Sequence, residues 1–404
     1  MVGRLMVPLL LLTALVATSA PTVAARTPAP TPPVPSADPF YTPPAALPGE
    51  PGALLRHRAV DVYAEPLRAL PVPVRAWQLL YRSTSATGEP NAVSATLLVP
   101  RSPWPEEPRP LVSYAVGTHG LGDSCAPSYR LRTGTENEIA LISQALFQGW
   151  AVVVTDYEGL GTPGRHTYAT GQSEGRAVLD AARAATRVPG AGLRPDGRVG
   201  VFGYSQGGQA AAFAGELQPT YAPDVRLAGV AAGGVPADLT DVARFNDGGP
   251  FLGLVLGAAA GLATAYPDVP FAEILNERGR RTVARIEDAC VAELGAAAPF
   301  ARLADFVTVP DPLADPRWQA RLRENRAGER RPGAPVYLYH GILDELIPYP
   351  VGSELRTRYC ALGAAVRWRP VPLAGHITAV SAVGPAGMRW LGDRFAGKAV
   401  RSAC

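Results

Sequence analysis

The sequence predicts an α/β protein with a mostly parallel central sheet that is flanked by helices. Short apolar runs without polar alternation, such as 151–155 (AVVVT), are typical of strands that are buried on both faces. Stretches with helical spacing separate these runs along the chain, and this order favours parallel pairing. The run 199–203 leads into Ser205 and then into a helical pattern, which indicates a strand, a sharp turn and a helix.

The strand-like runs begin with an antiparallel hairpin and continue as buried strands. The hairpin is expected from residues 74–82 and 92–99, with its turn at 87–90. Further strands are expected at 111–116, 151–155, 199–203, 225–232, 336–339 and 366–370. Helices are expected at 138–147, at 173–187, after Ser205, at 351–362 and at 378–395. These elements predict one sheet domain, which comprises residues 52–238 and 332–404.

Residues 239–331 form an insertion in this domain, because no strand pattern occurs from 241 to 331. Helical patterns cover 271–294 and 316–326, so the insertion is expected to be a helical cap or lid. An apolar stretch at 249–265 is expected to pack inside the insertion or against the sheet domain; a mobile lid or a wall for acyl chains is the alternative. Pro250 and Pro267 bracket this stretch closely, which disfavours a transmembrane helix.

The composition excludes some classes of protein. With 404 residues, of which 47% are hydrophobic and 18% charged, the chain can bury a large core. The net charge of +3 is small for this length. An arginine-rich stretch at 317–331 is interpreted as a solvated helical face. We therefore expect no nucleic-acid partner.

The N-terminal residues predict export. A cationic start, an apolar run at 5–16 and small residues at 23–25 indicate a secretory signal peptide of residues 1–25 that is cleaved after Ala25. The run is too short to span a bilayer, so the mature chain is expected to be extracellular and to have no transmembrane segment. Residues 26–51 are rich in proline and are expected to form an extended surface arm without regular elements.

The chain has four cysteines: Cys125, Cys290, Cys360 and Cys404. An even number in an exported protein predicts two disulfides, although the sequence alone leaves three pairings open. No Cys-x-x-Cys or His-x-x-x-His spacing occurs, so no metal site is expected.

Ser205 is the candidate nucleophile. A serine hydroxyl needs a base at hydrogen-bonding distance, and that base needs a carboxylate to fix its tautomer. His376 follows the last expected strand and Asp344 follows the strand before it, so both lie at carboxyl ends of strands. The order Ser205, Asp344, His376 is the order that α/β-hydrolases use.

Other groups compete for some roles in this site. Asp238 and Glu345 are the alternative carboxylates. The oxyanion formed by attack on a carbonyl needs hydrogen-bond donors, and the backbone N–H of Gln206 is one by position. A second donor is expected from the loop after strand 111–116, where Thr118 or His119 is best placed.

The segment 159–164 matches the Gly-x-Gly-x-x-Gly pattern of dinucleotide-binding loops. Pro163 and further loop residues separate it from the next expected helix, so no helix N-terminus is available for a pyrophosphate. The segment is interpreted as a shaped loop, and no cofactor is expected.

From about Asp38 to its end the chain resembles the secretory lipase family, α/β-hydrolases that include fungal lipase A enzymes and actinobacterial relatives. The matching segments are GTHGLGDSCAPSY (117–129), DYEGLGTP (156–163), GYSQGG (203–208), HGILDELIP (340–348) and AGHI (374–377). This resemblance implies an α/β-hydrolase fold with a helical cap, and a Ser205, His376 and Asp344 triad. It also implies that Cys125 pairs with Cys290 and Cys360 with Cys404. The fungal members carry an acidic residue near the position of His119, so this sequence departs there.

The expected function is that of a secreted serine carboxylester hydrolase, a lipase or esterase that acts through an acyl-enzyme on acylglycerols or other lipid-like esters. Transient contact with a lipid interface is expected, without a metal or diffusible cofactor. Acyl transfer, peptide cleavage and an inactive binding protein on the same scaffold are the alternatives.

Overall fold

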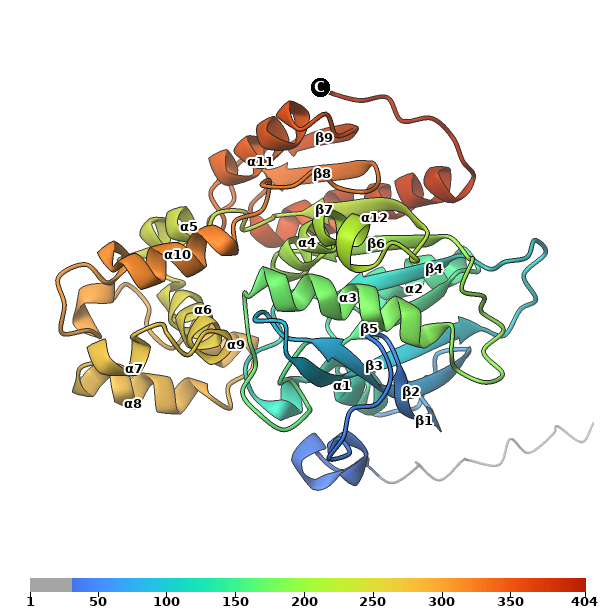
Figure 1. The fold of residues 1–404 in the computed structure, drawn as a ribbon, viewed down its shortest axis with the longest axis horizontal. Helices are drawn as coiled ribbons and strands as arrows, with labels where there is room; N and C mark the ends of the chain where they lie inside the picture. The colour runs from blue at the N-terminus through green and yellow to red at the C-terminus, as the bar shows by residue number, and fades with distance from the viewer. Residues whose placement is uncertain (1–30) are drawn as a thin grey trace, which may run out of the picture. The chain divides into compact units, whose positions relative to one another are not determined.

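The computed structural model describes residues 31–404, so the signal peptide and its cleavage after Ala25 lie outside the described residues. Within the described part, nine strands form one sheet in the order β1-β2-β3-β5-β4-β6-β7-β8-β9 (Figure 1). Their bounds are β1 Leu54–Val60, β2 Val74–Thr84, β3 Pro90–Pro100, β4 Leu111–Ala115, β5 Ala151–Thr155, β6 Val199–Tyr204, β7 Leu227–Gly233, β8 Val336–Gly341 and β9 Val366–Val371. Pairing is antiparallel from β1 to β5 and parallel from β5 to β9.

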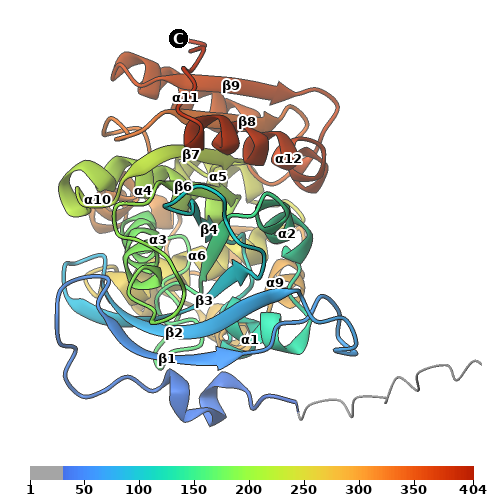
Figure 2. The same ribbon diagram turned by 90° about the vertical axis from the view of Figure 1, so that its right-hand side faces the viewer.

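Helices cover both faces of this sheet, which confirms the predicted fold class. Figure 2 shows α3 and α4 on one face and α2 and α12 on the other. The helices outside the insertion are α1 Pro127–Thr133, α2 Ile139–Phe147, α3 Gly171–Ala185, α4 Gln206–Tyr221, α11 Tyr349–Ala361 and α12 His376–Phe395. The central strands β4, β5 and β6 are buried at every position, because helices pack on both of their sides.

The expectation that the proline-rich arm lacks regular elements was wrong for its described part. Two 3₁₀ turns, η1 Pro35–Ala37 and η2 Pro39–Tyr41, each begin at a proline, whose fixed φ suits the first turn of a helix. Asp38 is buried and pairs with Arg58 and Arg132. The hydroxyl of Tyr41, also buried, lies 2.9 Å from Ser128 Oγ. The arm is therefore anchored to the sheet domain rather than lying extended over it.

The insertion contains α5 Leu239–Asn246, α6 Leu252–Ala265, α7 Phe271–Ile274, α8 Glu277–Ile286, α9 Val291–Gly295 and α10 Pro316–Glu324. The helical pattern at 271–294 is divided into three helices, α7, α8 and α9. The side chain of Asn276 caps α8 by accepting from Gly279 N–H at 2.9 Å, and Cys290 precedes α9. The capping residue Asn276 and the disulfide-bonded Cys290 therefore interrupt what looks like a continuous amphipathic pattern.

The apolar stretch 249–265 becomes α6, which packs both inside the insertion and against the sheet domain. A Cβ on Gly253 would lie 2.0 Å from the carbonyl oxygen of Leu294, and a Cβ on Gly261 would lie 2.3 Å from that of Tyr168. Glycine at these two positions lets the α6 backbone approach both neighbours closely. No helix among residues 31–404 combines the length and the apolar character needed to cross a bilayer.

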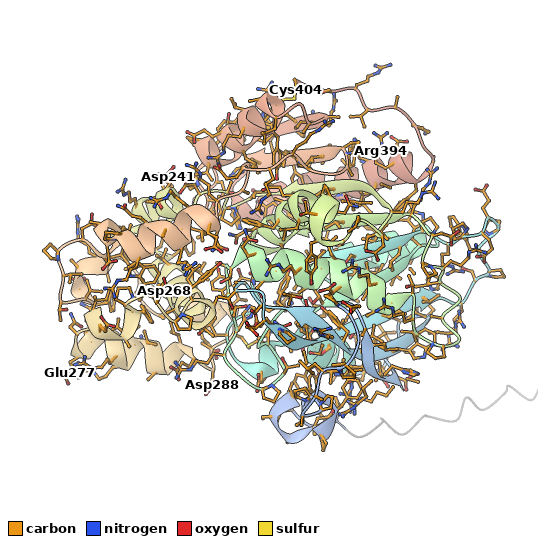
Figure 3. The ribbon with its side chains drawn as sticks, in the orientation of Figure 1. Asp241, Asp268, Glu277, Asp288, Arg394 and Cys404 are labelled. Atoms are coloured by element: carbon orange, nitrogen blue, oxygen red, sulfur yellow. A yellow bond between two sulfur atoms is a disulfide. The ribbon has the colours of Figure 1, made fainter. Side chains whose placement is uncertain are left out.

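Two disulfides join distant segments, in the pairs that the resemblance implies. Cys125–Cys290 links the loop that follows β4 (residues 116–126, the β4 loop) to the insertion. Cys360–Cys404 links α11 to the end of the chain, which is labelled in Figure 3. The β4 loop also bonds to the insertion through its backbone, because Leu121 N–H donates to Ala289 O at 2.8 Å and Val291 N–H donates to His119 O at 2.9 Å.

Candidate active site

Ser205 lies at the turn between β6 and α4. Its φ of 60° and ψ of −123° are unusual for a residue with a side chain, so the turn is strained. A Cβ on Gly203 would lie 2.0 Å from the carbonyl oxygen of Gly207, and a Cβ on Gly207 would lie 2.0 Å from that of Ala115. Only glycine fits at these two positions beside the serine.

The structure brings Ser205, His376 and Asp344 together at the carboxyl edge of the parallel strands. Nε2 of His376 lies 2.9 Å from Oγ of Ser205, and its Nδ1 lies 2.8 Å from Oδ2 of Asp344. With Asp344 ionised, the tautomer assigned from these contacts has Nδ1–H donating to the carboxylate. The lone pair on Nε2 then faces the serine hydroxyl, which is the arrangement that proton removal from Ser205 requires.

The surroundings of Asp344 favour its ionised form. Its Oδ1 accepts from the backbone N–H groups of Leu346 and Ile347 at 3.0 and 2.8 Å. Burial acts to raise the pKa of Asp344, but the hydrogen bond from His376, together with the Ile347 amide, outweighs burial and lowers the pKa. The carboxylate that fixes the imidazole is therefore a stable anion.

Neither alternative carboxylate reaches the imidazole. Glu345 Oε2 accepts from the backbone N–H of His376 at 2.8 Å, so it holds the loop rather than the ring. Asp238 caps α5 by accepting from Thr240 N–H at 3.0 Å. Tyr204 also holds this loop, because its hydroxyl donates to the carbonyl oxygen of His376.

The β4 loop approaches Ser205 at Gly117, where a Cβ would lie 4.0 Å from Ser205 Cβ. Gly117 N–H donates to Oε1 of Glu138 at 2.6 Å, and the hydroxyl of Tyr114 donates to its Oε2 at 2.6 Å. Glu138 therefore fixes the start of the loop. Glu138 was not among the predicted site residues, because a glutamate at the start of a helical pattern is an ordinary helix-terminal residue.

The side chain of His119 has both ring nitrogens engaged. Nδ1 lies 2.9 Å from Gly117 O, and Nε2 lies 2.9 Å from Oε1 of Glu136. Burial acts to lower the pKa of His119, but Glu136, Glu138 and the Gly117 carbonyl raise it to about 9, so the ring is an imidazolium at neutral pH. The His119 side chain thus has no N–H left for an oxyanion.

Of the other two predicted oxyanion residues, Gln206 follows Ser205 in the chain and Thr118 lies in the β4 loop. Gln206 is the first residue of α4, where a backbone N–H has no partner within the helix. Thr118 follows Gly117 in the β4 loop, and its hydroxyl lies 3.1 Å from that of Tyr168.

A second buried polar cluster holds the side chain of Gln206. Its Nε2 lies 2.8 Å from Oε1 of Glu174 and 3.2 Å from Nε2 of His166. Burial raises the pKa of Glu174 to about 8 and lowers that of His166 to about 4. Glu174 and His166 were not among the predicted site residues, since the sequence of α3 and of the loop before it gives no local sign that these segments face α4.

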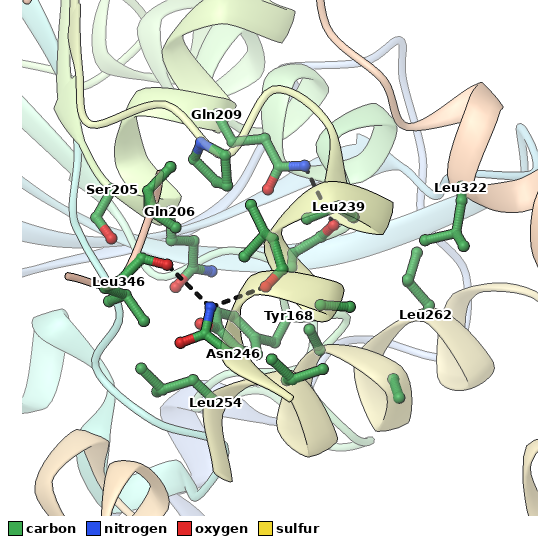
Figure 4. Close-up of a pocket in the computed structure, with 18 of the residues that line it drawn as sticks. Tyr168, Ser205, Gln206, Gln209, Leu239, Asn246, Leu254, Leu262, Leu322 and Leu346 are labelled. Atoms are coloured by element: carbon green, nitrogen blue, oxygen red, sulfur yellow. Dashed lines mark hydrogen bonds between the residues drawn. The ribbon is translucent and has the colours of Figure 1, made fainter. Parts of the chain in front are cut away.

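An apolar pocket opens beside Ser205 between the sheet domain and the insertion (Figure 4). It contains about 710 Å³ of unfilled space, part of which is open to solvent. Its walls come from the residues around Ser205, from α5, α6 and α10, and from Leu346 and Ile347. Most of the lining side chains are aliphatic or aromatic, so the pocket suits a hydrocarbon group held next to the serine.

The glycine-rich segment 159–164 is part of a loop, and α3 begins only at Gly171. Gly159 and Gly161 have φ values of 71° and 85°, and Gly161 N–H donates to Asp123 at 3.2 Å. The segment thus shapes a connection to the β4 loop and opens no helix.

Comparisons with known proteins agree with this architecture. Residues 127–403 match the family model described as secretory lipase. A Mycobacterium tuberculosis protein described as a probable inactive lipase is 34% identical over 377 residues, which cover 90% of this chain and 83% of the relative. A secreted triacylglycerol lipase of Malassezia globosa, LIP2, is 32% identical over 392 residues, which cover 92% and 84% of the two chains.

Solved structures of a lipase and an esterase share this fold. Candida antarctica lipase A in its closed state superposes with a TM-score of 0.84 at 29% identity, covering 93% of this chain and 89% of that one. The cell-wall-degrading esterase LipA of Xanthomonas oryzae, at 20% identity, shares the fold with a TM-score of 0.68, covering 85% and 98%. The fold and these neighbours define the class as an α/β-hydrolase that cleaves carboxylic esters. Within that class, the chain belongs to the secretory lipase family.

Proposed function

We propose that this protein is a secreted lipase or esterase in which Ser205 is the nucleophile, His376 the general base and Asp344 the residue that orients His376. The observation that carries the proposal is the continuous contact from Asp344 through His376 to Ser205, at the mouth of an apolar pocket. The family and its extracellular relatives support lipid esters, triacylglycerols among them, as substrates.

The reaction follows from these contacts. Ser205 Oγ attacks the ester carbonyl while its proton passes to His376 Nε2, and the imidazolium that forms is stabilised by Asp344. The carbonyl oxygen becomes an oxyanion, which accepts from the backbone N–H of Gln206 and from that of Thr118. His376 then protonates the leaving alcohol, and an acyl-enzyme on Ser205 remains. Water attacks this ester by the same route, which releases the acid and restores the serine.

The insertion, residues 239–331, acts as the cap in this proposal. It supplies α5, α6 and α10 to the pocket wall, so it selects the group that lies next to Ser205. Transient contact with a lipid surface and cleavage of the precursor after Ala25 complete the proposal.

The test is hydrolysis and covalent labelling of the same preparations. The wild-type protein should hydrolyse short p-nitrophenyl esters and take up a fluorophosphonate probe, whereas Ser205→Ala should lose both while keeping its melting temperature. Because one relative is described as a probable inactive lipase, labelling is the decisive measurement. A wild-type protein that is folded but not labelled would refute the proposal.

A further inference from the structure

Three carboxamide side chains lie in the wall of the pocket beside Ser205. Gln206 and Gln209 come from α4, and Asn246 comes from α5 (Figure 4). Their exposed fractions are 3%, 0% and 1%, so all three are buried in an otherwise largely apolar lining. Buried polar groups need hydrogen-bond partners, so each of these side chains calls for an explanation.

The NH₂ group of two of them is bound to backbone carbonyls. Asn246 Nδ2 donates to Val242 O at 2.8 Å and to Leu346 O at 2.9 Å. Gln209 Nε2 donates to Ala169 O at 3.4 Å. If either amide were flipped, its oxygen would lie next to a backbone carbonyl oxygen, and the two oxygens would repel each other. The contacts therefore fix the orientation of both amides.

The orientation of Gln206 is fixed by a side-chain cluster. His166 Nδ1 donates to Glu158 O at 2.8 Å, so its Nε2 carries the lone pair and accepts from Gln206 Nε2. Glu174 Oε1 accepts the second N–H of the same group at 2.8 Å. Both amide hydrogens of Gln206 are thus used on the side of α3.

The three carboxamide oxygens have no partner among the described residues. Gln209 Oε1 is buried and makes no hydrogen bond. The side-chain hydrogen bonds of Gln206 and Asn246 all use their nitrogen atoms. The nearby hydroxyls of Thr118 and Tyr168 are within hydrogen-bond distance of each other. Gln209 Oε1 is closed off from solvent, whereas the oxygens of Gln206 and Asn246 are not, so the pocket presents two acceptors that a ligand can reach.

These acceptors discriminate between ligands. A purely hydrocarbon group that displaced water from the pocket would leave them unpaired, which is costly in a buried site. A ligand with a hydroxyl group would replace the lost hydrogen bond, and sites of this kind reject analogues that lack the hydroxyl. No charged side chain lines the pocket, so a neutral donor fits better than an ammonium group.

We propose that the preferred ester substrates carry a free hydroxyl group near the scissile bond, and that this hydroxyl donates its hydrogen bond to the oxygen of Gln206 or of Asn246. This proposal rests on the proposed function, since it takes Ser205 as the nucleophile. The hydroxyl can belong to the acyl chain, as in a hydroxy fatty acid ester, or to the alcohol, as in a partial glyceride.

The test compares kcat/KM for matched esters in two arms. In the acyl arm, p-nitrophenyl esters of fatty acids of one length carry a hydroxyl that is moved stepwise along the chain, or none. In the alcohol arm, a monoacylglycerol is compared with the propyl ester of the same acid. We expect kcat/KM to rise about tenfold or more for the hydroxylated member in at least one arm. Equal values in both arms, on protein that a fluorophosphonate labels fully, would overturn this proposal alone. Absence of labelling would instead refute the proposed function.

Variants of the pocket residues test which side chain binds the substrate hydroxyl. Gln206→Met and Asn246→Leu each remove one of the two oxygens and keep a side chain of similar size, so the preference for the hydroxylated ester should fall several-fold in at least one of them. Leu254→Met changes an apolar wall residue of the same pocket and is the matched control, for which the preference should persist. If all three variants keep the wild-type ratio of kcat/KM values, and all are labelled at the wild-type rate, neither oxygen binds the hydroxyl and the assignment of these acceptors is wrong.

Discussion

The imidazole of His119 and the carboxylate of Glu136 form a buried pair beneath the β4 loop, with Nε2 2.9 Å from Oε1. The folded-state pKa of His119 is about 9, above its ordinary value of 6.5. The stabilisation from this pair is therefore fully present below about pH 6.5 and is lost as the pH rises through 9.

Glu136→Gln should remove this stabilisation. Breaking a buried pair costs about 3–5 kcal/mol, so the variant should be less stable than the wild type at pH 6. The difference should shrink toward pH 9, where His119 loses its charge in the wild type as well. Urea unfolding of the wild type and of Glu136→Gln at pH 6 and pH 9 measures this difference in stability. Glu106→Gln, at an exposed site, is the control. A difference that does not change with pH would contradict the assigned ion pair.

Glu174→Gln should change the pH dependence of stability at lower pH values than Glu136→Gln does. Burial raises the pKa of Glu174 to about 8, so between its ordinary value and 8 the folded state holds a proton that the unfolded state has lost. Wild-type stability therefore falls as the pH rises across this range, and the glutamine variant lacks this loss. The melting temperature of the variant relative to the wild type should increase from pH 5 to pH 8. Glu89→Gln, at an exposed site, should show no such trend.

Asp344→Asn should lower kcat by about 10⁴, because an amide lets His376 adopt the tautomer that cannot accept the serine proton. Glu345→Gln is the matched control, since its carboxylate contacts the His376 backbone and not the ring. That variant should lose far less activity. Steady-state kinetics with a soluble ester measures kcat for both variants. A larger loss of kcat in Glu345→Gln than in Asp344→Asn would show that Glu345, and not Asp344, orients His376.

Replacing both Cys125 and Cys290 by serine should lower the free energy of unfolding by about 2–5 kcal/mol, since the bond constrains the unfolded chain. The pair Cys360 and Cys404 spans 44 residues instead of 165, so its removal should cost about 1 kcal/mol less. Only the first double variant should also reduce ester hydrolysis, because Cys125 lies in the β4 loop. Chemical unfolding and initial rates on both variants check this, and equal effects would argue against a special role for the first bridge.

The sequence predicted those parts of the molecule that local patterns encode. The buried strands, the glycine-flanked turn at Ser205 and the order of Ser205, Asp344 and His376 all follow from runs of a few residues and their placement. The edge strand β1 was missed, because Arg56, His57 and Arg58 interrupt its apolar residues and hide the strand pattern. The breaks at Asn276 and Cys290 depend on capping, which competes with a strong helical period.

The polar clusters around the site could not be predicted in the same way. His119 and Glu136 are 17 residues apart and Glu174 and Gln206 are 32 apart, and each pair meets only through tertiary packing. Their local sequence identifies them as polar residues, but it does not say which partner each one faces. Burial then turns such contacts into large pKa shifts, which no local pattern carries.

The bonds between the β4 loop and the insertion bear on how this enzyme can be redesigned. Cys125–Cys290, the amide of Leu121 and the amide of Val291 join the loop beside the nucleophile to the segment that forms the pocket roof. The insertion is consequently not an exchangeable module. A chimera that takes the segment corresponding to residues 239–331 from another family member must take the matching β4 loop as well. Substrate choice and the geometry around the nucleophile therefore change together.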